Sequence, residues 1–281
     1  MKKILAVLTI LLSCDTGELD IVADIPVLLN EVSGIEQSPN SESIWMINDS
    51  GNKPQLFLVN LEGTIEGVID INAKNRDWED LTLDLEGNLY IGNFGNNGNA
   101  SKKLSILKIP KEELVLGKTI TPKKIKFKYA DQNKFPPKKK NRYFDCEAFI
   151  HFQDNLYLFT KSRVNNDFGR TNVYKIPAIA GEYEAELVGS FKTCDDLPCW
   201  ITAADISENG NMLALLTLDA VWTFTEFEND DFFSGKKTRH DLEHRSQKES
   251  LCFKDSGTVY IADEYAAGTG GNLYEFKLQK N

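Results

Sequence analysis

The chain has 281 residues, and its 32 basic and 42 acidic residues give a formal net charge of −10 at pH 7. Because phosphate binding needs a basic face, this balance argues against nucleic acid as a partner. The length suits one or two domains, and since no linker rich in Pro, Gly or Ser divides the chain, one domain is the simpler interpretation.

The first segment in chain order has the features of an export signal. Lys2 and Lys3 precede an apolar run, 4–12, that is too short to cross a bilayer as a helix. The run ends in the order Leu, Leu, Ser, Cys at 11–14, which resembles the lipobox of bacterial lipoproteins. This resemblance implies that Cys14 becomes the acylated first residue of the mature chain. An ordinary signal peptide that contains a cysteine is the alternative.

We therefore expect a lipoprotein signal peptide (1–13), a lipidated tether (14–18) and a folded domain (19–281). The lipid on Cys14 would anchor the protein to a membrane of the cell envelope, facing the periplasm or the cell surface. Such an oxidising location allows disulfides. Cys194 and Cys199 bracket a turn-like insert, so we expect them to pair, with buried free cysteines as the alternative.

The folded domain contains a repeated pattern of strands. Short β-branched and aromatic runs bounded by Gly, Asn and Asp recur, while helical periodicity is almost absent. The clearest unit, 79–93, has an acidic residue, an alternating strand, a Gly-Asn turn and a second strand. Similar units begin near residues 36, 147, 202 and 249. Each is followed by a third strand and most by a fourth, more polar one, which is the composition of a propeller blade.

The segment 19–25 precedes the first unit and belongs to none of them, whereas the last unit has only three strands. Pairing the two would complete the last blade and remove an exposed edge. The sequence thus predicts an all-β fold: a single five-bladed β-propeller of four-stranded antiparallel blades, with the N-terminal strand closing the last blade. A sixth blade within residues 94–146 is the alternative.

Aligning the units produces two sets of side chains that carry oxygen. One set stands at the start of the innermost strands: Glu36, Glu79, Glu147, Thr202 and Glu249. The other stands at the end of the second strands: Asn48, Asn93, Thr160, Thr217 and Asp263. In a hairpin the start of one strand lies beside the end of the next, so both sets should surround the same end of the central channel.

Converging carboxylates repel one another by roughly 4 kcal/mol per pair at about 4 Å near a protein surface. A bound cation, raised carboxyl pKa values, or basic partners such as Lys161 and Arg163 would offset this repulsion. Oxygen ligands without His or Cys favour calcium over zinc. The predicted metal ligands are Glu36, Glu79, Glu147, Glu249, Asn48, Asn93 and Asp263. The predicted channel-lining residues are Thr160, Thr202, Thr217, Lys161 and Arg163. The alternative is that these side chains only hydrogen-bond loop amides.

Several short motifs support the same architecture: 77–81, 145–149, 247–251, 93–99 and 160–163. Together they resemble bacterial propellers of the SdiA-regulated type and, more loosely, the NHL-like group. The resemblance implies a five-bladed ring with a metal ion in its channel.

Two functions remain open, because propellers host both. The first is a monomeric envelope lipoprotein that binds a divalent cation in its channel and a small molecule or an envelope protein at its top loops. The second is a metal-dependent hydrolase of a phosphoester or a lactone, with Glu79 or Glu147 as general base.

Overall fold

The computed structural model describes residues 16–39 and 41–278, so the predicted signal peptide and Cys14 lie outside the described residues. The described chain is all-β, as the sequence predicted, apart from short 3₁₀ helices. These are η1 (Val27–Leu29), η2 (Lys111–Glu113), η3 (Lys139–Asn141) and η4 (Leu197–Cys199). Over the same residues, no helix has the length and apolar character needed to span a membrane.

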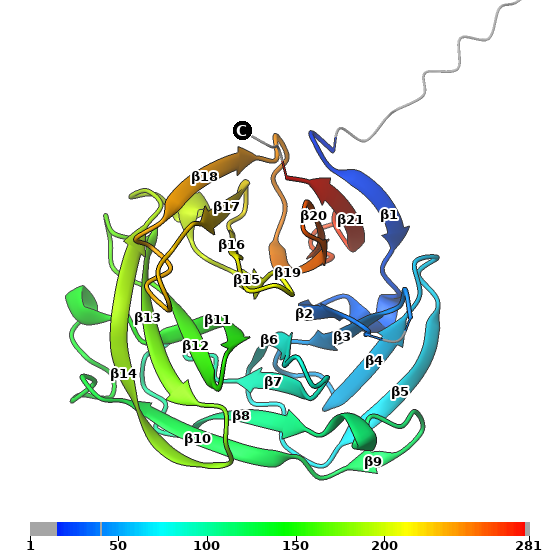
Figure 1. Cartoon of the computed structure of the whole chain (residues 1–281), viewed down its shortest axis with the longest axis horizontal. Helices are drawn as coiled ribbons and strands as arrows, with labels where there is room; N and C mark the ends of the chain where they lie inside the picture. The colour runs from blue at the N-terminus through cyan, green and yellow to red at the C-terminus, as the bar shows by residue number, and fades with distance from the viewer. Residues whose placement is uncertain (1–15, 40, 279–281) are drawn as a thin grey trace, which may run out of the picture.

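Within the described ranges the strands form four hydrogen-bonded sheets around a common centre (Figure 1). The first sheet contains β2 (Val32–Gln37), β3 (Ile44–Asn48), β4 (Gln55–Val59), β5 (Ile65–Ile71) and β9 (Thr119–Ile120). The second contains β15 (Ala203–Ile206), β16 (Met212–Leu216), β17 (Ala220–Thr225) and β18 (Lys236–Asp241). The third contains β19 (Lys248–Asp255), β20 (Thr258–Asp263), β21 (Asn272–Lys277) and β1 (Asp20–Asp24).

The fourth sheet has eight strands and begins and ends at the centre. Its strands, in order, are β11 (Asp145–Phe152), β12 (Asn155–Lys161), β13 (Arg170–Pro177), β14 (Gly181–Lys192), β10 (Lys123–Tyr129), β8 (Leu104–Ile109), β7 (Leu89–Asn93) and β6 (Trp78–Leu83). Each half is antiparallel, and the halves meet in a parallel pair between β10 and β14. β14 is long enough to pair with β10 through 181–185 and with β13 through 186–192. The strand pattern of the sequence predicts separate blades and does not indicate this junction. The parallel pair leaves neither outer edge unpaired.

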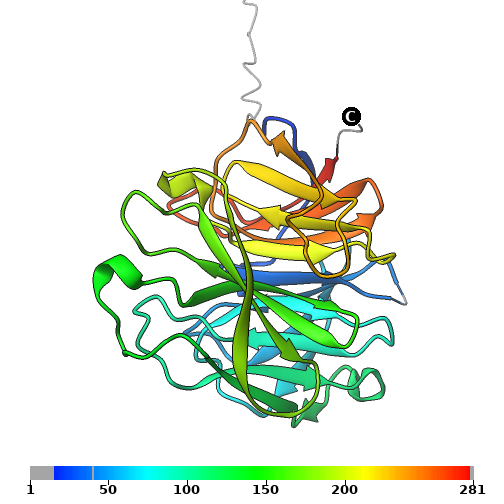
Figure 2. The same ribbon diagram turned by 60° about the vertical axis from the view of Figure 1, so that its left-hand side comes forward.

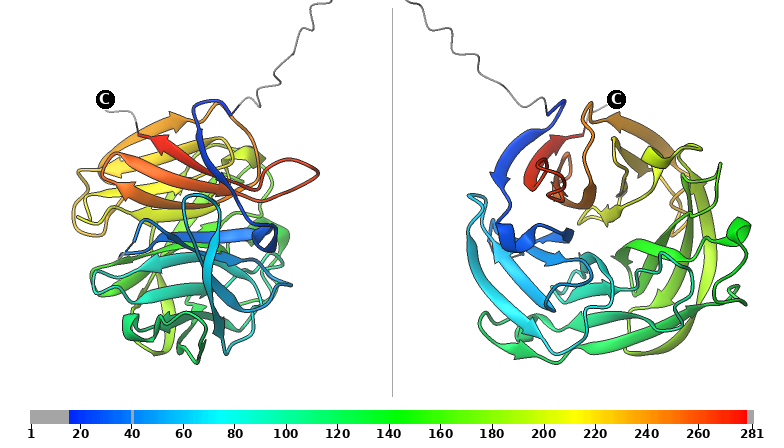
Figure 3. Two further views of the ribbon diagram at one scale, coloured as in Figure 1. Left: turned by 90° about the vertical axis from the view of Figure 1, so that its right-hand side faces the viewer. Right: turned by 180° about the vertical axis from the view of Figure 1, so that it is seen from behind.

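The N-terminal strand pairs with the C-terminal one. β1 runs antiparallel to β21, from Asp20 opposite Glu275 to Asp24 opposite Asn272. Both views of Figure 3 show these two strands side by side at one edge of the molecule. The segment 19–25 therefore covers an edge that would otherwise present unpaired backbone groups.

The innermost strands are β2, β6, β11, β15 and β19 (Figure 1). They pack in a closed cycle, with β2 against β6, β6 against β11, β11 against β15, β15 against β19, and β19 against β2. Neighbouring sheets pack face to face around this cycle (Figure 2). Large apolar side chains such as Trp78, Tyr90 and Phe149 are fully buried between them. Since the apolar core lies between the sheets, the residues that face the channel are free to be polar.

Candidate functional site

Each of four inner strands carries a β-bulge near its start. The shifts in pairing fall between Val32 and Gly34, Trp78 and Asp80, Cys146 and Ala148, and Lys248 and Ser250. The extra residues are therefore Ser33, Glu79, Glu147 and Glu249. A bulge changes the direction of its side chain, and three of the four bulged residues are glutamates that the sequence analysis selected. The site is thus built from a repeated distortion of the inner strands.

Glu36 does not lie where the alignment of the repeats placed it. It pairs with Trp45 near the far end of β2, three residues beyond the bulge at Ser33. Burial raises its pKa well above the ordinary value, and the charges of Asp205 and Asp80 raise it further. The alignment that placed Glu36 with Glu79 was therefore wrong by three residues, because the first unit has a serine where three of the other four units have a glutamate.

Glu79 lies in a carboxylate cluster at the other end of the channel. Asp49 follows β3, Asp77 precedes β6, and these two residues and Glu79 each offer an oxygen within 4.8 Å of the others. A Cβ at Gly95 would overlap the carboxylates of Glu79 and Asp77, so this glycine allows the loop to approach them closely. Glu79 is one of the residues predicted from the sequence, whereas Asp49 and Asp77 are not, although Asp77 opens the 77–81 motif. We call Asp49, Asp77 and Glu79 the acidic triad.

The pKa values in this region reflect burial and mutual repulsion. Burial raises the pKa of Glu79 well above its ordinary range, and Glu147, Asp49 and Asp77 add to the effect. Burial likewise raises the pKa of Asp49 to about 6 and, although Lys161 opposes it, that of Glu249 to about 7. The channel end therefore holds more carboxyl groups than can ionise together at low cost.

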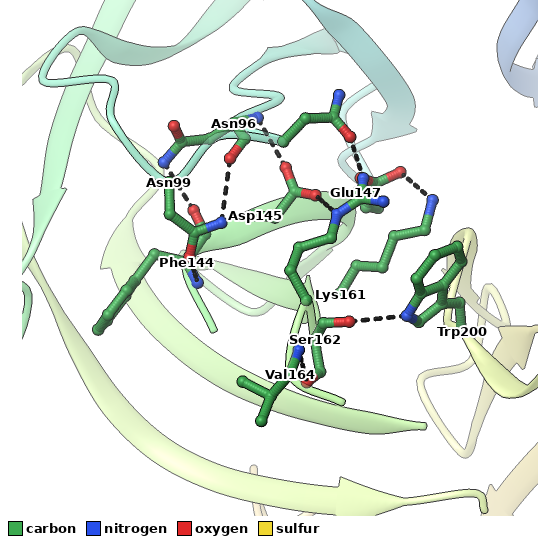
Figure 4. Close-up of polar contacts among 11 residues, drawn as sticks. Asn96, Asn99, Phe144, Asp145, Glu147, Lys161, Ser162, Val164 and Trp200 are labelled. Carbon is green, nitrogen blue, oxygen red and sulfur yellow. Dashed lines mark hydrogen bonds and ion pairs between the residues drawn. The ribbon is translucent and has the colours of Figure 1, made fainter. Parts of the chain in front are cut away.

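Lys161 and Arg163 form a basic pair that contacts the carboxylates of β11, and Figure 4 shows Lys161 beside Glu147. Lys161 Nζ is 2.9 Å from Glu147 Oε2, while Arg163 donates to Asp145 at 2.5 Å and to Glu147 at 3.2 Å. Burial opposes the charge of Lys161, but the carboxylates of Glu147 and Glu249 outweigh it and raise the lysine pKa. The predicted basic partners thus lie in the channel, and they neutralise Glu147 and Asp145.

Trp200 completes this side of the channel end. Its Nε1 donates to the Ser162 carbonyl at 2.7 Å, and its ring lies 5.1 Å from Lys161 Nζ and 4.9 Å from the guanidinium carbon of Arg163. Cation–π contacts of this kind hold the two basic side chains in place. Cys194 and Cys199 form a disulfide immediately before Trp200, so the segment that presents the ring is covalently closed.

An asparagine-rich loop positions the start of β11. The Asn96 amide nitrogen donates to Asp145 Oδ1 at 2.7 Å, and its side chain donates to the Phe144 carbonyl at 2.8 Å. Asn99 Oδ1 accepts from the Phe144 amide at 2.8 Å (Figure 4). Asn99 has a positive φ of 53°, a conformation that asparagine tolerates better than most residues. The 93–99 motif therefore fixes the carboxylate that Arg163 contacts.

The second predicted set lies in the expected register but mostly bonds the loop backbone. Asn48, Asn93, Thr160 and Asp263 each pair with the residue before a bulge. The Asn48 side chain donates to the Leu28 carbonyl, and the Asn93 side chain bonds the backbone of Lys74 and Arg76. Thr160 accepts from the Asn172 amide, and Asp263 accepts from the Asn272 amide and from the Tyr274 hydroxyl. Thr217 donates to Ala220 O, and Thr202 to Lys248 O. These contacts agree with the alternative interpretation, in which the side chains hydrogen-bond the backbone of loops and bind no metal. Only Asn48 Oδ1 among these side-chain oxygens is buried without a hydrogen-bond partner in the described part of the chain.

Two further aspartates connect neighbouring inner strands below this end of the channel. Asp80 accepts the Phe149 amide at 3.1 Å, and Asp205 accepts the Phe253 amide at 2.7 Å. Together with Glu36 they form a second, deeper group of carboxyls. Their hydrogen bonds to backbone amides indicate a structural role.

No family model matches the chain, and no curated protein matches it either. Among solved structures, it is similar in fold to a gluconolactonase from Xanthomonas campestris, with 11% identity, a TM-score of 0.51, and coverage of 94% of this chain and 92% of that one. A virginiamycin B lyase from Staphylococcus aureus, solved with quinupristin, aligns at 15% identity and a TM-score of 0.43. This alignment covers 88% of the present chain and 66% of the lyase. The likeness to the gluconolactonase supports a β-propeller fold.

Proposed function

We propose that the protein is a cell-envelope lipoprotein whose channel binds a divalent cation at the acidic triad and whose surrounding loops bind a ligand. The observation that carries this proposal is the approach of oxygens from Asp49, Asp77 and Glu79 to within 4.8 Å of one another. Ligands 2.3–2.6 Å from one calcium ion lie no farther apart than about 5 Å. The spacing and the oxygen-only chemistry therefore suit calcium.

The distribution of charge favours the acidic triad over the neighbouring carboxylates. Glu147 and Asp145 already have Lys161 and Arg163 as counter-ions. The three residues of the acidic triad form no ion pair with any residue in 16–39 or 41–278, and burial raises the pKa of each. A cation would supply the missing positive charge, so we place it at the triad and not at the predicted Glu36, Asn93 or Asp263.

The ligand would lie beside the cation. Arg163 is only partly buried, and Trp200 presents an aromatic ring next to it. A planar guanidinium can bond a carboxylate or phosphate oxygen through two N–H groups. We therefore favour a small molecule that carries an anionic or strongly polar group, with an envelope protein as the second option.

The architecture that we assign to this function is a five-bladed propeller. Its eight-stranded sheet counts as two blades joined at β10 and β14, and the closed cycle of inner strands supports this count. The anchor rests on the lipobox-like order at 11–14, and the Cys194–Cys199 disulfide is compatible with an oxidising compartment. The similarity to SdiA-regulated propellers belongs to the same proposal.

A metal-dependent hydrolase is the second candidate, and the raised pKa of Glu79 favours it. A carboxyl whose pKa is shifted toward neutrality is suited to general acid–base work. Glu147 is held by two basic side chains, so Glu79 is the better choice of the two predicted bases. Phosphoesters and lactones remain the substrate classes to test, and the gluconolactonase with the same fold makes lactones the first choice.

Calcium titration of the chelator-treated protein by calorimetry tests the proposal. Wild type should bind one ion, and Asp77→Asn or Glu79→Gln should weaken binding at least about 10-fold. Glu112→Gln, an exposed carboxylate on η2, is the matched control and should bind normally. Binding that is unaffected by the triad substitutions would contradict the assignment. Lactone and phosphoester turnover, with and without chelator, distinguishes the hydrolase from the binding protein.

A further inference from the structure

A large basic groove lies on the outer side of the eight-stranded sheet. It has a volume of about 920 Å³ and is lined by β8, β10, the start of β14, and the loops around 72–76 and 102–103. β10 contributes three lysines, Lys124, Lys126 and Lys128, and the two loops contribute three more lysines and an arginine. Among the residues that the structure describes, its acidic lining residues are Glu182 and Glu184. This concentration of positive charge stands out on a chain whose net charge is −10.

Most of this positive charge has no ion-pair partner among residues 16–39 and 41–278. Glu182 and Glu184 pair with Lys126 and Lys128 at 2.7 Å, and all four side chains are more than half exposed. Exposed pairs of this kind contribute little and can open toward a ligand. Five other lining cations form no ion pair with any described residue: Lys74, Arg76, Lys102, Lys103 and Lys124. An anionic ligand would therefore meet several free charges.

The groove is built by ordered elements. β10 alternates exposed lysines with buried Ile125 and Phe127, which places its lysines on one face at intervals of roughly 6.7 Å. Asn93 holds the neighbouring loop, because its amide donates to the Lys74 carbonyl and accepts from the Arg76 amide, both at 3.1 Å. Asn93 thus positions two cations of the groove.

The groove also offers an uncharged polar group. Asn72 adds an exposed amide, whereas Leu104, Leu107 and Phe127 belong to the lining but are buried in the core. Amides suit the hydroxyl groups of a sugar. The volume is at the upper end of the range for small-molecule pockets, about 300–1,000 Å³, so the groove has room for more than one sugar unit. A planar membrane surface would not fit a concave site.

We propose that this groove binds an acidic polysaccharide, a chain of sugars that carries carboxylate or sulfate groups at regular intervals. The lysines and the arginine would bind the anionic groups, and the Asn72 amide would bond a sugar hydroxyl. This site is separate from the acidic triad, and its binding does not require the channel cation.

Fluorescence anisotropy with labelled oligouronate and sulfated oligosaccharide tests the proposal, with neutral dextran of the same length as control. Chelator is present throughout, so that no cation bridges protein and sugar. We expect binding of at least one acidic saccharide, weakened by salt, and no binding of dextran. The double substitution Lys103→Gln with Lys124→Gln should lower the affinity about 10-fold.

The matched control is Lys236→Gln with Lys277→Gln, which removes the same charge from exposed positions in two other sheets. Its affinity should equal that of wild type, and thermal melting should show all variants folded. If both double variants lost the same affinity, the saccharide would be attracted by the overall positive charge and not by the groove, and the proposal would be overturned. So would absence of binding to both acidic saccharides at low salt, equal binding of dextran, or binding confined to polyphosphate or to vesicles of phosphatidylglycerol.

Discussion

Lys161 Nζ lies 2.9 Å from Glu147 Oε2, and the two side chains are only 9% and 5% exposed. The pair divides the channel end into two parts with different electrostatics. On one side, Lys161 and Arg163 neutralise Glu147 and Asp145. On the other, Asp49, Asp77 and Glu79 face one another without an ion pair to any residue that the structure describes. The position proposed for the cation follows from this division.

The buried pair itself should respond strongly to removal of one partner. Lys161→Met leaves Glu147 with Arg163 alone, and an uncompensated buried charge should lower the free energy of unfolding by about 3 kcal/mol. Adding Glu147→Gln to Lys161→Met should recover part of this loss. Urea unfolding measures both values. Lys175→Met, which breaks the more exposed pair with Asp230, should cost less than about 1 kcal/mol; an equal cost at both sites would refute the difference in burial.

Gly95 should control cation binding through its lack of a side chain. In Gly95→Ala the new Cβ would overlap the carboxylates of Glu79 and Asp77, so the acidic triad must move apart. We expect calcium affinity to fall at least about 10-fold, measured by calorimetry. Gly98→Ala lies in the same loop, and its Cβ would meet nothing closer than 3.9 Å. It should bind calcium as wild type does, and equal behaviour of the two variants would count against the triad.

Stability without a cation should fall as the pH rises from about 6.5 to 8. Burial raises the pKa of Glu249 to about 7 and that of Glu264 to about 8, so the folded state holds protons that the unfolded state has released. Burial lowers the pKa of His151 and His240. Below this window these two groups therefore make the free energy of unfolding increase with pH. Since the unfolded state binds fewer protons over the window, the free energy of unfolding decreases with pH.

Urea unfolding in chelator at pH 6.5, 7.2 and 8.0 checks this dependence. Glu249→Gln removes one of the titrating groups and should show a smaller decrease than wild type. Calcium should also reduce the decrease, because the ion favours ionised carboxylates. A wild-type stability that rises over this window, or a variant with an unchanged slope, would contradict the proposed protonation.

The strand pattern could be predicted because alternation of apolar and polar residues has a period of two and the turns carry Gly and Asn. The all-β fold follows from it, and so does the pairing of 19–25 with the last strand. The junction between β10 and β14 could not be predicted, because it depends on β14 being long enough to pair on both edges.

The candidate site was predicted in part. Glu79, Glu147 and Glu249 share a motif and a bulge, so aligning the repeats gave these three residues equivalent positions in their strands. Glu36 was misplaced because a bulge adds a residue without a sequence signature of its own, and the first unit carries Ser33 there. Asp49 lies in a connection whose distance from β6 depends on how neighbouring sheets pack, which local patterns do not determine.

The most direct test of the central claim is the anomalous difference map of a crystal grown with manganese or calcium. For calcium we expect a peak about 2.3–2.6 Å from one oxygen each of Asp49, Asp77 and Glu79, and loss of that peak in Asp77→Asn. A well-ordered channel in which these three carboxylates surround no peak at saturating ion, or a peak bound only to Glu36, Asp80 and Asp205, would contradict it.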